Sequence, residues 1–61
     1  MNVIIYTVDG GIAYLKTDYS NLDKYMDALN LFPKPFIKAT NRNGSKVLIN
    51  TRNISAIEED N

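Results

Sequence analysis

The stretch FIKATNRNGSKVLIN, residues 36–50, decides the fold, because it reads as two short strands around a tight turn. A two-residue turn at Asn43 and Gly44 would mix polar and apolar side chains on both faces of the hairpin. A three-residue turn, with Gly44 in the left-handed conformation of a bulge, instead pairs Ile37 with Ile49 and makes one face wholly apolar. We predict the three-residue turn, since a half-buried antiparallel sheet needs one apolar and one solvated face.

The solvated face of this hairpin carries basic residues. Residues 31–53 contain five cations and no acid, although the whole chain has a formal net charge of zero. In the predicted register Lys38 and Lys46 project from the outward face beside Phe36, with Arg42 at the hairpin tip and Lys34 just upstream. A patch of positive charge attracts a phosphate backbone or an acidic protein surface. The simplest interpretation of these cations, however, is a solvated face that discourages edge-to-edge aggregation. The predicted partner-binding residues are Lys34, Phe36, Lys38, Arg42 and Lys46.

Another hairpin is predicted earlier in the chain, at residues 3–16, and we call it the first hairpin. Both Asp9-Gly10 and Gly10-Gly11 suit a two-residue turn, so the register stays open by one residue. In either register Tyr6 and Tyr14 fall on opposite faces, and the first strand has apolar side chains on both.

A helix is predicted between the hairpins. Ser20 or Asn21 caps its start, Asn30 its end, and the prolines that follow forbid continuation. Its apolar stripe has the spacing i, i+3, i+4 and i+7 and consists of Leu22, Tyr25, Met26 and Leu29.

The tail, residues 54–59, alternates imperfectly and reads as a short strand or a single helical turn. Ile54 and Ile57 are expected to close the core. The predicted fold is α+β, of order ββαββ, with a mostly antiparallel sheet and one helix packed on one face. We expect one domain over residues 1–61.

The geometry also predicts a homodimer. One helix covers only one face of a sheet, and an uncovered apolar face marks an interaction site. We expect Val3, Ile5 and Tyr14 to form the dimer interface, in a closed assembly that stacks or extends the sheet.

Composition argues against several classes of function. The chain has no Cys and no His, so the commonest metal ligands, the commonest catalytic base and the most reactive nucleophile are missing. We therefore expect no enzyme, no catalytic residues, no cofactor and no metal site. The only apolar run, residues 3–6, is far shorter than a membrane span of about 20 residues, which predicts a cytoplasmic protein with no membrane partner.

The closing run GSKVLINTRNISAIEE, residues 44–59, resembles small uncharacterised proteins of Gram-positive bacteria and their phages. The resemblance implies an intracellular accessory protein of the class that binds and inhibits a host protein. We expect a small non-enzymatic binding module, a protein-interaction partner such as a phage-type regulator or inhibitor. The alternatives are single-stranded nucleic-acid binding through the basic hairpin face and a structural subunit of a larger assembly.

Overall fold

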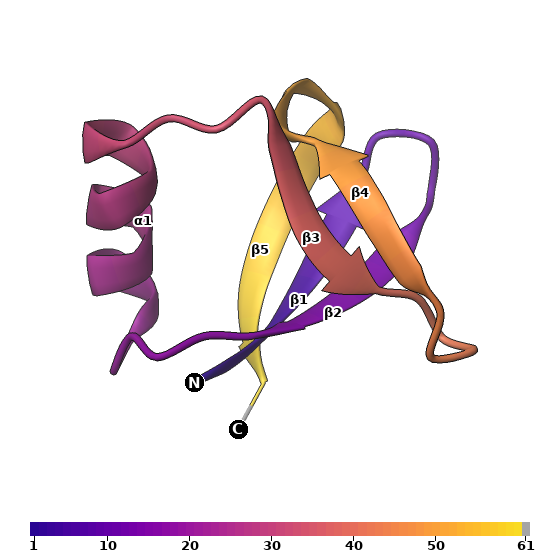
Figure 1. Cartoon of the computed structure of the whole chain (residues 1–61), viewed down its shortest axis with the longest axis horizontal. Coiled ribbons are helices and arrows are strands. Elements are labelled where there is room, and N and C mark those ends of the chain that lie inside the picture. The colour runs from indigo at the N-terminus through magenta and orange to yellow at the C-terminus, as the bar shows by residue number, and fades with distance from the viewer. Residues whose placement is uncertain (61) are drawn as a thin grey trace.

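The computed structural model describes residues 1–60 and contains one antiparallel sheet and one helix (Figure 1). The five strands follow the sheet order β4-β3-β2-β1-β5. This arrangement confirms the α+β fold of order ββαββ and adds a fifth strand. In chain order the elements are β1 (Asn2–Thr7), β2 (Ile12–Lys16), α1 (Leu22–Leu31), β3 (Phe36–Thr40), β4 (Lys46–Asn50), a 3₁₀ turn η1 (Thr51–Asn53) and β5 (Ile54–Asp60).

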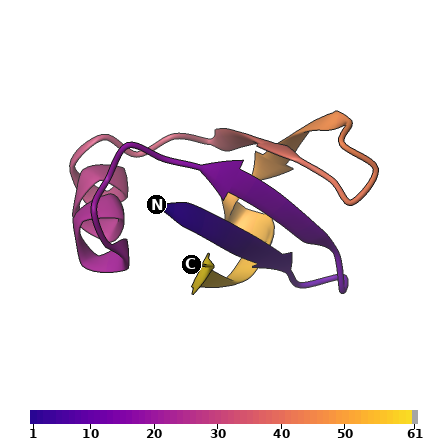
Figure 2. The same cartoon turned by 90° about the horizontal axis from the view of Figure 1, so that it is seen from below.

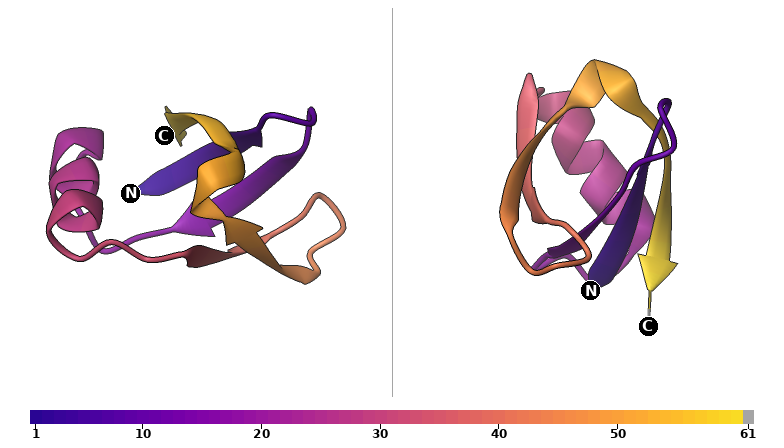
Figure 3. Two further views of the ribbon diagram at one scale, coloured as in Figure 1. Left: turned by 90° about the horizontal axis from the view of Figure 1, so that it is seen from above. Right: turned by 90° about the vertical axis from the view of Figure 1, so that its right-hand side faces the viewer.

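The sheet curls on itself, so that β3 and β4 face β1 and β5 across the core (Figure 3). The buried centre consists of Ile5, Ala13, Ile37 and Ala39, and partly buried side chains from the other elements pack against it. They include Ile54 and Ile57 of β5, which therefore close the core as predicted. Two alanines at the centre leave little side-chain volume between the strands, which suits a tightly curled sheet.

Helix α1 stands beside the end of the curled sheet where β1 begins and β2 ends (Figures 1 and 2). Its stripe contributes Tyr25, which is buried, and Leu29, which packs against the core cluster. The Asn21 side chain accepts a hydrogen bond from the Lys24 backbone N–H at 2.9 Å, so Asn21 is the N-cap. The expected C-cap was wrong: the helix runs one residue past Asn30 and ends at Leu31.

The predicted dimer residues Val3 and Ile5 are wrong, because both lie inside the protein. Val3 is 1% exposed and Ile5 is 0% exposed. The prediction assumed that only a helix could cover this face of β1, whereas the curled sheet covers it with its own strands. Tyr14, the third residue of that set, is 38% exposed and lies on the outer face.

Both hairpins use the same three-residue turn. In the second, the Asn41 N–H donates to the Ser45 carbonyl at 2.9 Å, and Gly44 has φ +81°. Pairing of Ile37 with Ile49 confirms the predicted register. The left-handed conformation at the last turn position is the reason that position holds glycine.

The first hairpin repeats this geometry: the Thr7 backbone N–H donates to the Gly11 carbonyl at 3.0 Å. Gly10 takes the left-handed position, with φ +88°. Ile4 therefore pairs with Tyr14, which places Tyr6 and Tyr14 on the same face of the sheet. The prediction that the two tyrosines face opposite ways was wrong, because it considered only two-residue turns.

The tail forms a strand, which was one of the two predictions for residues 54–59, and a 3₁₀ turn precedes it. Residues 51–53 form η1, and residues 54–60 form β5, which pairs antiparallel with β1. At its far end β5 also reaches the helix: Glu59 accepts a hydrogen bond from the Leu22 backbone N–H at 2.6 Å. Because the first N–H groups of a helix have no partner within it, Glu59 satisfies one of them from a distant strand.

Replacing Ile5 tests whether the curled sheet is the core. Ile5→Ala is expected to lower the free energy of unfolding by about 2–5 kcal/mol, since it removes a fully buried side chain. Urea unfolding followed by circular dichroism measures the change. Val8→Ala, at a position 68% exposed, is the control and should change the stability by less than about 0.5 kcal/mol. Similar losses in the two variants would contradict this assignment of the core.

Replacing Glu59 tests the connection between β5 and α1. Glu59→Ala is expected to lower the free energy of unfolding by about 1 kcal/mol, because a helix N–H loses its charged acceptor. Asp60→Ala removes a carboxylate one position further along the strand and should lower the free energy of unfolding clearly less. Thermal unfolding of both variants gives the comparison, and equal losses would mean that the hydrogen bond contributes nothing.

Candidate functional site

The outer face of β2, β3 and β4 brings the predicted cations together. Tyr14 of β2 pairs with Thr40 of β3, which in turn pairs with Lys46 of β4. Two residues earlier on β3, and on the same face, Lys38 pairs with Leu48. Directly opposed residues on neighbouring strands have Cβ atoms about 5 Å apart, so these side chains form one surface.

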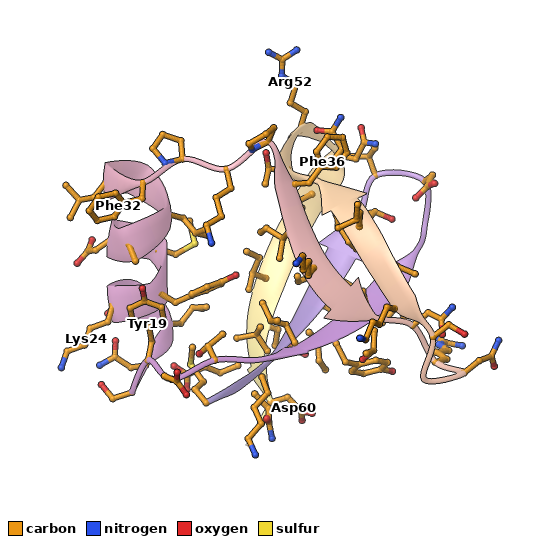
Figure 4. The ribbon with its side chains drawn as sticks, in the orientation of Figure 1. Tyr19, Lys24, Phe32, Phe36, Arg52 and Asp60 are labelled. Atoms are coloured by element: carbon orange, nitrogen blue, oxygen red, sulfur yellow. The ribbon has the colours of Figure 1, made fainter. Side chains whose placement is uncertain are left out.

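Phe36 completes this surface at the start of β3, where it pairs with Asn50 (Figure 4). Its side chain is 51% exposed and that of Leu48 is 65% exposed. We call this surface the basic face and define it by Tyr14, Phe36, Lys38, Lys46 and Leu48.

A shallow depression of about 420 Å³ lies in the basic face. Tyr14 and Leu48 give it apolar walls, while Lys38 and Lys46 supply ammonium groups. Thr40 lies between them on β3, and its hydroxyl donates to the Tyr14 carbonyl at 3.2 Å. The depression thus combines apolar surface with two cations.

A larger groove of about 850 Å³ separates α1 from β2 and β3. Its lining includes lysines and aromatic residues, and Asp18 is the one acid among the lining residues. Lys38 lines both the groove and the depression, so the two hollows adjoin. The charged and aromatic residues that line the groove are Lys16, Lys34, Lys38, Asp18, Tyr19, Tyr25, Phe32 and Phe36.

Two of the aromatic residues that line this groove are in contact with each other. The rings of Tyr19 and Tyr25 lie with their centroids 5.7 Å apart. Burial, and to a lesser extent the neighbouring Tyr19, raises the pKa of the Tyr25 phenol above its ordinary value. Tyr25 therefore stays neutral through the physiological range, and the positive charge at the groove comes from its lysines.

The structure brings together most of the residues predicted from the sequence. Phe36, Lys38 and Lys46 share the outer face, and Lys34 lies at the adjoining groove. Arg42 lies in the turn between β3 and β4, at the edge of this region.

Lys16, Phe32 and Leu48 were missed as site residues, and Tyr14 was predicted for a dimer interface rather than for the basic face. Only its exposure identifies Leu48 as part of a site. Tyr14 joins the basic face because β2 pairs with β3, and no local pattern specifies that pairing, since the helix separates the two strands in sequence.

Acidic residues gather on the opposite edge of the sheet. Glu58 and Asp60 lie on β5, where they pair with Ile4 and Asn2 of β1. These acids and Lys46 therefore lie on strands at opposite ends of the sheet order. The other acids are not segregated: Asp23 and Asp27 share α1 with Lys24, and Asp18 lines the groove with Lys16.

Comparison with known proteins places no relative beside this chain: no protein-family model, no curated protein and no solved structure matches it. Within residues 1–60 no group of three or more His, Cys, Asp or Glu side chains is placed to hold a metal ion. The helix in these residues falls short of the length and apolar character that a membrane span requires. The basic face and the adjoining groove carry ammonium groups, which attract anions, and exposed rings, which offer flat apolar contact.

The acidic edge gives a direct test of the geometry. The Tyr6 hydroxyl donates a hydrogen bond to Glu58 at 3.0 Å, and this bond is the main reason that the pKa of Tyr6 is raised. Glu58→Gln is expected to return that pKa toward its ordinary value of 10.0, because the carboxylate charge disfavours the phenolate. Ultraviolet titration of phenolate formation, assigned with a Tyr6→Phe variant, measures the shift. An unchanged titration would contradict the hydrogen bond between Tyr6 and Glu58.

Proposed function

We propose that this protein is a small non-enzymatic binding module whose basic face docks on an acidic surface of another protein. The supporting observation is that exposed apolar side chains lie among cations on one continuous surface. Phe36 and Leu48 are more than half exposed, and Lys38 and Lys46 flank them on the same strands.

This distribution resembles that of protein interfaces. Aromatic and aliphatic anchors supply most of the affinity at the centre of an interface, and charged residues at the rim set orientation and association rate. Exposed Leu48 adds nothing to the stability of a solvated face, but it gains from being covered by a partner. The weak resemblance of residues 44–59 to small bacterial and phage proteins supports a regulator or inhibitor of a host protein as the biological role.

A second candidate is binding of single-stranded nucleic acid. Its support is that the fold supplies two aromatic rings, Tyr14 and Phe36, where the hairpin alone offers one. Single-strand binders combine such rings, on which bases stack, with cations that hold phosphates. We rank it second because the sequence pI of about 6.0 is well below that of typical nucleic-acid-binding domains.

Charge reversal on the basic face tests the proposal. The double variant Lys38→Glu with Lys46→Glu is expected to weaken binding of a protein partner at least tenfold, because two rim cations become repulsive. The immobilised protein is used to capture a partner from a Gram-positive bacterial lysate, and the affinity for the purified partner is then measured by calorimetry. Lys24→Glu, at an exposed position on α1, is the control and should bind as the unaltered protein does.

The same proteins separate the two candidates. Fluorescence anisotropy with a labelled oligo-dT should show no binding at low salt if the partner is a protein. Binding that falls steeply with salt and is lost in the double variant would favour nucleic acid instead. A captured protein that binds both variants equally would contradict a role for the basic face and leave the structural-subunit interpretation.

A further inference from the structure

The two edges of the sheet differ in how they are protected. Edge strands expose unpaired backbone groups, and proteins usually protect them with bulges and charges. The β5 edge has both: its register with β1 shifts between Tyr6 and Thr7, and it ends in Glu58, Glu59 and Asp60.

The β4 edge lacks most of this protection. Lys46–Asn50 pair with β3 without a break in register, and the segment contains no proline, no glycine and no acid. No other strand among residues 1–60 pairs with its free side. Lys46 is the one charged residue of the strand, and it lies at the end rather than at the centre.

The backbone groups on this free edge can be identified from the turn. Asn41 and Ser45 form a hydrogen-bonded pair, and such pairs alternate along an antiparallel ladder. The N–H and C=O groups of Val47 and Ile49 therefore point toward β3. Those of Lys46, Leu48 and Asn50 point toward the free edge.

The sequence of β4 is complementary to itself in an antiparallel arrangement. If two copies pair around a two-fold axis at Leu48, that residue lies opposite its own counterpart and Val47 lies opposite Ile49. Lys46 then lies opposite Asn50, so no like charges are opposed across the strands. Each outward-directed backbone group of one copy meets its counterpart on the other.

We infer that this chain forms a two-fold homodimer in which the β4 edges of two copies pair and join their sheets. The occupant of the edge is a second copy, because the hydrogen-bonding positions, the apolar pairs and the absence of opposed like charges all follow from one axis at Leu48. Pairing covers Leu48, which is 65% exposed in one copy, and extends the apolar inner row of Val47 and Ile49. This inference does not depend on the proposed function, and it replaces the buried Val3 and Ile5 with an accessible interface.

The dimer also affects the basic face. Joined β4 strands place two copies of that face on neighbouring parts of one sheet surface. A partner with two acidic sites could bind both at once, which raises the apparent affinity without any new contact.

The experiment uses the proposed two-fold axis, which places Leu48 of one copy opposite Leu48 of the other. Sedimentation equilibrium of the unaltered chain at up to about 100 μM should give twice the monomer mass, in the range expected for a small interface. Leu48→Lys and Leu48→Glu should each sediment as monomers, since each variant opposes two like charges. An equimolar mixture of the two variants should again form dimers. Val8→Lys, at another exposed apolar position, is the control and should remain dimeric.

Several results would overturn the inference. A monomeric unaltered chain, or a dimer that both Leu48 variants preserve, excludes pairing at β4. A mixture that stays monomeric excludes the two-fold axis at Leu48. Circular dichroism shows whether each variant is folded. The single variant Lys38→Glu, on β3 and outside the β4 edge, tests the proposed function separately.

Discussion

The burial of Ile5 in a sheet that curls around it is the constraint on which the rest of the structure depends. A chain of 61 residues buries a modest fraction of its surface, and without cysteine it cannot add a disulfide. A flat sheet with one helix would leave half of its apolar side chains in water. Curling solves this problem because β3 and β4 cover the inner side chains of β1 and β5, so that one sheet acts as both layers of the core.

β1 is the fourth of the five strands in the sheet order and has a neighbour on both sides. It pairs with β2 on one side and with β5 on the other, so it joins the first segment of the chain to the last. The helix contributes less to this core: Tyr25 is its one buried residue, and Asn21 and Glu59 fix its first turn. The wide groove beside α1 follows from this arrangement, because the helix closes one end of the sheet rather than covering its length.

Local pairing rules predicted the parts of the fold whose residues are close in sequence. The second hairpin was predicted in the correct register because a single choice of turn made one face apolar. The same rule would have solved the first hairpin, since Thr7–Gly11 and Asn41–Ser45 form the same turn with glycine at the fourth position. Two-residue turns were favoured there because the adjacent glycines suit them equally well. The apolar pattern of β1 then suggested an uncovered face, whereas the covering strands lie far away in sequence.

The candidate site shows the same division between local and long-range information. Lys38, Lys46 and Phe36 could be placed together because one hairpin holds them. Tyr14 and Lys16 could not, because their positions beside the hairpin depend on the pairing of β2 with β3 across the helix.

The curl also determines what the surface can do. Because the inner side of the sheet is occupied by the core, Phe36, Leu48 and Tyr14 of the outer face stay exposed, as do Leu31 and Phe32 at the end of α1. Lys38 and Lys46 lie on the same strands as Phe36 and Leu48, whereas Glu58, Glu59 and Asp60 lie on β5 at the other end of the sheet order. Folding of the core thus leaves apolar and basic groups together on the outer face of β3 and β4.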